Sequence, residues 1–249
     1  KSDALSYLAG RTSTWILHSM PNNIVTDELV LALNVGDLSS YPTTGTTCYD
    51  LSGEGNNGTL TNGPTFNSNG YLEFDGVDDK VSISNDSSID FTTNSFSLHA
   101  LVNSDQVGNT RFIMGKGNSI SISSGKGYSL YLGNSGTTWL FGLWDGTGNV
   151  SVGSTDSVAA GRWVNLHGVW NASDNTQKMY INGQLKSTNT HTISSISVTN
   201  PLYVGTGNNS AGYWNGSIAK TSIYDKALSE DEVTQNYYQA PIVTDGLVF

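Results

Sequence analysis

The sequence predicts an all-β fold in which two antiparallel sheets stack as a sandwich, with one short helix near the C-terminal end. Charged residues make up 13% of the 249 residues, against a usual share of about 25%. Gly, Ser, Thr and Asn supply the polar character instead, and short runs of alternating apolar and polar residues recur between them. This combination is typical of many short strands joined by tight turns.

The first residues of the chain differ in pattern from the rest of the sequence. Residues 1–22 hold Leu5, Leu8, Trp15 and Leu17 in a weak helical pattern. We therefore expect an N-terminal arm, or the end of a preceding segment, over 1–22. The folded domain is expected over 23–240, and residues 241–249 are expected to form a C-terminal arm or the start of a further repeat.

The clearest strand is "SFSLHALVN", which begins at Ser95. Its alternation places Phe96, Leu98, Ala100 and Val102 on one face, and Ser97, His99, Leu101 and Asn103 on the other. The runs "YSLYLG", "TWLFGLW" and "WVNLHGVW" come later in the chain with similar spacing. The four histidines show no zinc-type spacing, and we expect His99 and His167 to point outward from sheet strands.

The sharpest turn signal is Asn182-Gly183 in "MYINGQLK". Both central residues of a type I′ hairpin turn need a positive φ, which Asn and Gly tolerate. The pairs Asn62-Gly63, Asn69-Gly70, Asp145-Gly146 and Asn215-Gly216 are expected to punctuate the chain in the same way.

One helix is predicted, from Ser229 to Tyr238, within "ALSEDEVTQNYY". Ser229 and Glu232 have the spacing of a capping box, in which each side chain bonds the other residue's backbone amide. Val233 and Tyr237 lie one helical step apart on one face.

The charge and the cysteine content exclude several functions. Eleven basic residues stand against 21 acidic ones, a net charge of −10, and no basic run could track a phosphate backbone. We therefore expect neither nucleic acid nor an anionic membrane surface as a partner. No apolar run approaches the length of a membrane span. Cys48 is the single cysteine, so no internal disulfide forms, and we expect its side chain to be buried.

Four stretches in order resemble a known family: "LVLALNVGDLSSYPTTGTTCYDLSGEGNNGTLTNGPTF", "GYLEFDGVDDKVSI", "GRWVNLHGVWNASDNTQKMYINGQL" and "GSIAKTSIYDKALSEDEV". The chain from Leu29 to Gln239 is similar to the laminin-G-like, concanavalin A-like jelly-roll modules of secreted bacterial proteins and phage virion proteins. It departs from the usual pattern at Asn34, at Cys48 and at Ala219-Lys220. The resemblance implies a two-sheet jelly roll.

A repeated stretch bears on the organisation of the protein. "IVTDELV" from Ile24 and "IVTDGLV" from Ile242 differ only at Glu28 and Gly246. We interpret the second stretch as the first strand of another copy of the module, which would make the natural protein longer. The alternative is a last edge strand of the same domain.

A hydrolytic site could arise only around "EFDGVDD". Glu73 and Asp75 share one face of a strand, as the carboxylates of some jelly-roll glucanases do. Gly76 is expected to end the strand, however, and the third carboxylate of such enzymes is absent. We therefore expect no enzymatic activity, with a glycoside hydrolase or lyase as an alternative.

The same acidic cluster is the candidate metal site. Asp75, Asp78 and Asp79 offer hard oxygen ligands of the kind that Ca²⁺ prefers. The alternative is that aspartates in a turn only cap its own backbone amides.

Two aromatic–polar groups are candidates for carbohydrate binding, Trp144 with Asp145 and Tyr213 with Trp214, each beside a turn. Aromatic residues at turns are less often part of a core than those within strands, such as Trp163. The alternative for Trp214 is packing inside the fold, because a strand comes directly after it.

These observations favour a non-enzymatic structural or adhesion module of a virion or cell surface, of the phage-fibre or capsid-decoration type, with glycans as candidate ligands. The expected partners are other virion or surface subunits in a homo-oligomer, and the expected location is the virion surface or the extracellular space. One alternative is a purely structural subunit-contact domain without a ligand.

Overall fold

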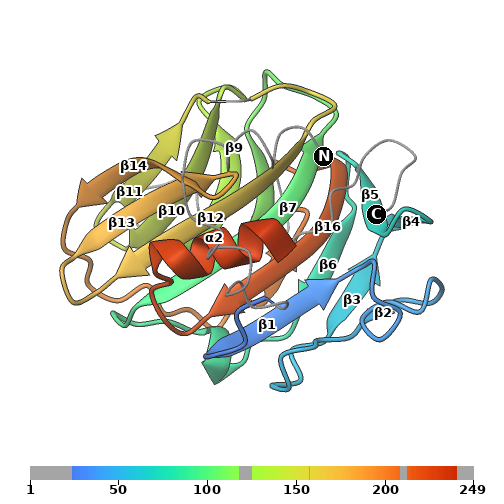
Figure 1. Ribbon diagram of the computed structural model, residues 1–249, viewed down its shortest axis with the longest axis horizontal. Coiled ribbons are helices and arrows are strands. Elements are labelled where there is room, and N and C mark those ends of the chain that lie inside the picture. The colour runs from blue at the N-terminus through green and yellow to red at the C-terminus, as the bar shows by residue number, and fades with distance from the viewer. Residues whose placement is uncertain (1–23, 118–124, 157, 208–211, 240–249) are drawn as a thin grey trace, which may run out of the picture.

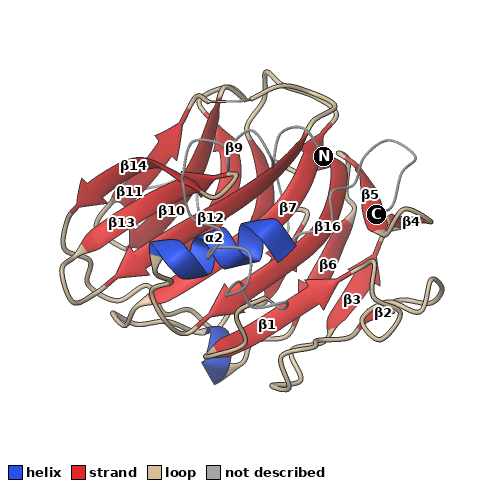
Figure 2. Cartoon of the chain, in the orientation of Figure 1, coloured by secondary structure: helices blue, strands red, loops and turns tan. Residues whose placement is uncertain are grey.

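The computed structural model describes residues 24–117, 125–156, 158–207 and 212–239. Two antiparallel sheets stack face to face, and helix α2 (Glu230–Gln239) lies across the outer face of one of them (Figures 1 and 2). The predicted all-β sandwich with one C-terminal helix is therefore confirmed. Within the described residues, no helix is long and apolar enough to span a membrane.

Sheet A carries the helix. Strand β16 pairs with β7 on one side, and on the other side it pairs with β5 through its first half and with β1 through its second half. In order, the sheet comprises β14 (Gln184–Thr190), β13 (Thr176–Ile181), β12 (Trp163–Asn171), β7 (Phe96–Ser104), β16 (Asn215–Tyr224), β5 (Tyr71–Asp75) and β4 (Thr65–Asn67), with β1 (Leu29–Asn34) beside β16.

Sheet B forms the other layer. In order, it comprises β11 (Asn149–Ser154), β10 (Thr138–Asp145), β9 (Lys126–Gly133), β8 (Arg111–Gly117), β15 (Leu202–Val204), β6 (Lys80–Ile83), β3 (Gly58–Thr61) and β2 (Thr47–Cys48). A short 3-10 helix, η2 (Ser87–Ile89), precedes β7.

The main core fills the space between the sheets. The alternating residues Phe96, Leu98, Ala100 and Val102 of β7 are fully buried there, as predicted. Cys48 is also buried in this core, which confirms the expectation for the single cysteine. Burying each large apolar side chain stabilises the fold by about 1.5–3 kcal/mol, so this layer dominates the stability.

A second apolar cluster lies under helix α2, on the outer face of sheet A. Val233 of the helix packs there with Val169 and Tyr224 of the sheet. The capping box forms as predicted, because Ser229 N donates to Glu232 Oε2 at 2.9 Å and Glu232 N donates to Ser229 Oγ at 3.3 Å. The predicted helix is confirmed, and its bounds shift by one residue.

His99 and His167 point outward from sheet A, as predicted, but they are not open to solvent. Both lie on the outer face of sheet A, but they are 2% and 0% exposed, and their rings stack at 4.4 Å. Strand alternation tells which face a side chain occupies; it does not tell whether another part of the chain covers that face.

The turns follow the Asn-Gly signals with one exception. Asn182 and Gly183 have φ of 51° and 75°, which confirms the type I′ turn between β13 and β14. Gly216, by contrast, lies inside β16 and ends no strand. A Cβ at Gly216 would lie 2.2 Å from the carbonyl oxygen of Asn103, so the glycine permits a close approach of β7 and β16.

The expectations for residues 1–22 and 241–249, including the second "IVTD" stretch, fall outside the described residues. The first stretch leads into β1 through a turn in which Leu29 N donates to Thr26 O. Lys226 Nζ donates to Asp27 Oδ2, which ties this segment to the chain just before helix α2.

Candidate functional site

One end of the sandwich brings together two groups of residues that the sequence singled out. Asp75 ends β5, Asn215 begins β16, and the two residues pair directly in sheet A. The acidic turn (Asp75–Asp79) and the Tyr213–Asn215 segment therefore lie side by side. We refer to these two segments, with Arg111 between them, as the loop end.

The acidic turn is built by its own side chains. Gly76 adopts a φ of 79°, which ends the strand as predicted. Asp75 Oδ1 accepts a hydrogen bond from Val77 N at 2.8 Å, and Asp79 Oδ2 accepts one from Asp75 N at 3.0 Å. One carboxylate oxygen from each of Asp75, Asp78 and Asp79 lies within 4.8 Å of the others.

This convergence of charge shapes the electrostatics of the turn. Asp75 and Asp78 are exposed, whereas Asp79 is 4% exposed. Burial raises the pKa of Asp79, the hydrogen bond from Asp75 N lowers it, and the nearby charges of Asp75 and Asp78 raise it further. A bound cation would relieve this repulsion.

The donor set fits Ca²⁺ in part. Ca²⁺ takes six to eight oxygen ligands, and a carboxylate keeps free lone pairs after accepting one hydrogen bond. Asp75, Asp78 and Asp79 would therefore supply about half of the coordination shell, and waters or backbone carbonyls would have to supply the rest.

Arg111 joins the two segments of the loop end. Its Nη1 donates to Gly76 O at 3.0 Å and to Tyr213 O at 2.7 Å. Its Nε is buried and has no hydrogen-bond partner among the described residues. Sequence reasoning missed this residue, because a single arginine at the start of a strand gives no signal until the fold places it between two loops.

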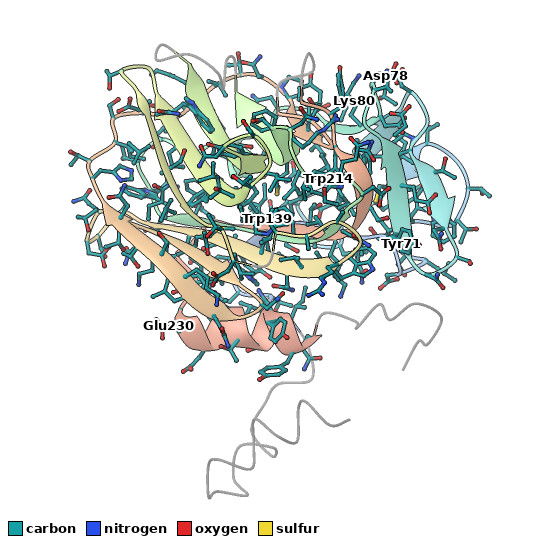
Figure 3. All side chains as sticks on the ribbon, turned by 90° about the horizontal axis from the view of Figure 1, so that it is seen from above. Tyr71, Asp78, Lys80, Trp139, Trp214 and Glu230 are labelled. Carbon is teal, nitrogen blue, oxygen red and sulfur yellow. The ribbon has the colours of Figure 1, made fainter. Side chains whose placement is uncertain are left out.

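The two predicted tryptophans are core residues in this structure. Trp214 is 0% exposed and packs 6.3 Å from Trp139, inside the sandwich (Figure 3). Trp144 is 1% exposed on the outer face of sheet B. Its ring lies over Gly142, where an added Cβ would come within 2.5 Å of it. Neither ring therefore presents a face to solvent. Tyr213, by contrast, is half-buried.

The carboxylate of Asp145 is hydrogen-bonded within the protein. It accepts hydrogen bonds from the amides and hydroxyls of Thr147 and Ser194. Burial alone would raise the pKa of Asp145, but these hydrogen bonds lower it to about 2. Trp144 and Asp145 do not join the loop end directly; the rings of Tyr131 and Phe112 lie between Trp144 and Gly212.

The two carboxylates on β5 share the outer face of sheet A, as the alternation predicts. Glu73 Oε1 accepts a hydrogen bond from Asn67 Nδ2 at 2.9 Å on the neighbouring strand β4. Asp75 is engaged in the acidic turn.

Comparison with solved structures supports the fold. The chain superimposes on the binding domain of botulinum neurotoxin serotype G with a TM-score of 0.66 and 17% identity, over 84% of this chain and 50% of that one. The superposition on Trypanosoma rangeli sialidase in complex with sialic acid has a TM-score of 0.62 and 15% identity, over 88% of this chain and 34% of that one. The superposition on the binding domain of botulinum neurotoxin DC in complex with SialylT has a TM-score of 0.59 and 15% identity, over 86% of this chain and 52% of that one.

The chain spans about half the length of these toxin binding domains. No curated protein sequence matches it. The family model of the concanavalin A-like lectin/glucanases superfamily matches residues 75–234, which is more than half of the chain and includes the acidic turn, strands β6 to β16 and the first half of helix α2. The chain therefore belongs to the concanavalin A-like lectin/glucanases superfamily.

Proposed function

We propose that this domain is a non-enzymatic carbohydrate-binding module and that the loop end is its binding site. The observation that carries the proposal is the convergence of Asp75, Asp78 and Asp79 within 4.8 Å beside the half-buried Tyr213. Sugar recognition combines an aromatic surface with a few placed polar groups, and the loop end offers both. The sialic acid and SialylT named with two structures of the same fold support glycans as the ligand class.

Binding without cleavage is part of the proposal. Glycosidases place two carboxyl groups on either side of the scissile bond, about 5–9.5 Å apart. Glu73 is bonded to Asn67 on the outer face of the sheet, and Asp75 caps its own turn. This arrangement supports hydrogen bonding to hydroxyl groups better than general acid catalysis.

Calcium belongs to the proposal as a cofactor of the acidic turn. When bound, the ion would offer free coordination positions to sugar hydroxyls. The chain's own contribution would be the Asp75, Asp78 and Asp79 carboxylates, with Arg111 holding the turn against Tyr213.

The setting that we propose is a virion or cell surface, in an assembly of like subunits. The low content of charged residues and the resemblance to modules of secreted bacterial and phage proteins support it. A glycan site and a subunit contact are separable roles for such a module, and the binding assay distinguishes them.

The test is a glycan array probed with the full chain, with and without millimolar calcium. We expect binding without any loss of intact glycan, and weaker binding for Asp75→Asn. Glu54→Gln, which changes an exposed carboxylate in another loop, serves as the matched control. Release of a sugar product, or no bound glycan under either condition, would refute the proposal.

A further inference from the structure

The sequence that leads into the first strand occurs twice in the chain. Residues 24–31 (the first stretch) and 242–249 (the second stretch) differ only at Glu28, where the second has Gly246, and at Leu31, where it has Phe249. Four apolar side chains of the first stretch are buried: Val25, Leu29, Val30 and Leu31. Two of them pack under helix α2 and two in the main core. We call the place that the first stretch fills, beside β16 in Figure 1, the β1 slot.

Backbone groups of the first stretch make two of the contacts that hold it in the slot. Val25 N donates to Oδ1 of the buried Asn236 in helix α2 at 2.9 Å. Glu28 O accepts a hydrogen bond from Asp225 N, also at 2.9 Å. Backbone contacts do not depend on the side chain of the residue that makes them, so a second stretch with the same path could make both.

The side chains that fit the slot recur in the second stretch. Asp27 Oδ2 accepts a hydrogen bond from Lys226 Nζ at 2.6 Å, and Asp245 stands at the corresponding position of the second stretch. The buried Leu31 corresponds to Phe249, which is also apolar, and the other buried positions are identical. The second stretch therefore carries the ion pair and the apolar residues that the slot requires.

The difference at Glu28 favours the second stretch. Glu28 has a φ of 53°, in the left-handed region where residues other than glycine are strained. Its side chain is exposed and makes no hydrogen bond to the described residues, so a glycine at this position would lose no contact there. Since the second stretch has Gly246 at this position, it would fill the slot without this strain.

We propose that the second stretch binds in the β1 slot of a neighbouring copy of this chain, in place of the first stretch. Exchanging an identical element between protomers is a low-cost route to assembly, because the incoming strand makes again the contacts that the displaced strand loses. The rest of β1, from Ala32 to Asn34, keeps its pairing with β16 in this exchange. The ladder already shifts register between Leu29 and Leu31, close to the point where the two strands would part.

This contact goes beyond glycan binding and does not depend on it. The slot borders the second half of β16, whereas the loop end lies at the first residue of that strand. The exchange would give the proposed assembly of like subunits a specific contact between neighbours.

The test cross-links Lys226 to the carboxylate beside it with a carbodiimide, which joins an amine and a carboxylate directly as an amide. The sample is an equal mixture of isotope-labelled and unlabelled full chains, and the linked peptides are identified by mass spectrometry. Besides the Lys226–Asp27 link, we expect a Lys226–Asp245 link between labelled and unlabelled chains, whose share rises with protein concentration.

Two variants test the fit at the strained position. Gly246→Glu gives the second stretch the residue of the first, and it should lower the share of the Lys226–Asp245 link about five- to thirtyfold, which is the cost of a left-handed residue other than glycine. Glu28→Gly removes the strain from the resident strand and should lower the share by a similar factor. Gly148→Glu makes the same change in a loop with open space around it, so it is the matched control and should leave the share unchanged.

Three results would overturn the inference. If Lys226 links to Asp27 alone at every concentration, the second stretch does not enter the slot. If Lys226–Asp245 links form only within single chains, the second stretch fills the slot of its own chain and the neighbour is the wrong partner. If Gly246→Glu leaves the share unchanged, the link arises from contacts outside the slot. The glycan array would give the same result in each case, because neither stretch belongs to the loop end, so failure of this inference is distinguishable from failure of the proposed function.

Discussion

The buried histidine pair makes the stability of the fold sensitive to mild acid. His99 and His167 are directly opposite each other on β7 and β12, and their rings stack at 4.4 Å. Burial lowers the pKa of His167 to about 3, and it lowers the pKa of His99 well below its usual range, with the charges of His167 and Lys220 adding to that effect. Both rings are therefore neutral in the folded protein at pH 5.

The other groups around the pair do not offset this effect. Asn165 Nδ2 lies 3.1 Å from His99 Nε2, and Lys220 approaches from β16 with a pKa that burial lowers to about 8. Tyr180 of β13 pairs with His167, and Asn236 of helix α2 bonds Tyr224 over the same face. None of these groups is an anion at this pH, so none of them would stabilise an imidazolium.

The expected loss of stability follows from proton linkage. Between pH 6.5 and 3 the unfolded chain binds a proton at His167 and the folded chain does not, so the free energy of unfolding falls as the pH falls, and the lowered pKa of His99 acts in the same direction. Each pH unit below a pKa of about 6.5 removes about 1.36 kcal/mol per histidine. At pH 5 His167 alone therefore removes about 2 kcal/mol, out of a total stability that is typically about 5–15 kcal/mol, and His99 adds to this loss.

Urea unfolding at intervals from pH 7.5 to 5 measures how the free energy of unfolding changes with pH. The variant His167→Leu shows which part of this change arises from His167. The variant keeps a buried apolar side chain and should lose the contribution of His167, which is about 2 kcal/mol between pH 6.5 and 5. His191→Gln is the comparison, because His191 is only partly buried and its lowered pKa arises mainly from burial, opposed by the charge of Asp145. A free energy of unfolding that stays constant from pH 7 to 5, or an unchanged slope in His167→Leu, would refute the reasoning.

Three further predictions concern single sites. Calcium at millimolar concentration should raise the Tm of the wild-type protein by mass action. Asp75→Asn should abolish this rise, and the control Glu54→Gln should keep it. An unchanged wild-type Tm would remove the cation from the proposal. Lys116→Met should lower the free energy of unfolding by about 1.5–3 kcal/mol, because it removes the hydrogen bonds of the fully buried Lys116 to Asp90 and Val198 O, while Asp90 keeps those from Ser197 Oγ and Val198 N; chemical denaturation measures this. Gly216→Ala should destabilise the fold strongly through its clash with Asn103 O, whereas Gly148→Ala, with open space around it, should change Tm little.

The local features of the fold could be predicted from the sequence because neighbouring residues determine them. The Ser229–Glu232 capping box needs only its own four residues, and the Asn182-Gly183 turn only its two central ones. The end of β5 at Gly76 is equally local. The proximity of the acidic turn to Tyr213 is not a local feature. It depends on the pairing of Asp75 with Asn215, which lies 140 residues later in the sequence.

The aromatic residues show why solvent exposure could not be predicted in the same way. A position at a turn suggested that Trp144 is open, yet its ring folds back over Gly142 and fills the space that a side chain there would have taken. A position within a strand suggested that Trp163 belongs to the core, yet it lies on the outer face and meets Tyr71 instead of the opposite sheet. In both cases the exposure of the ring depends on a partner residue. For Trp163 the partner is Tyr71, which tertiary packing brings near. For Trp144 it is Gly142, whose lack of a side chain leaves room for the ring.

The outer face of sheet A is covered near helix α2 and partly open toward the start of β12. Near helix α2 its polar residues are covered, and the cost of that burial appears as the lowered pKa of His167. Two residues along β12 from Asn165, toward the start of the strand, the cover ends and Trp163 becomes half-exposed. The side-chain oxygens of Asn103 and Asn165, which accept no hydrogen bond from the described part of the chain, lie at this boundary. Apolar residues at both positions would stabilise the sheet more, because a buried acceptor without a donor is unfavourable.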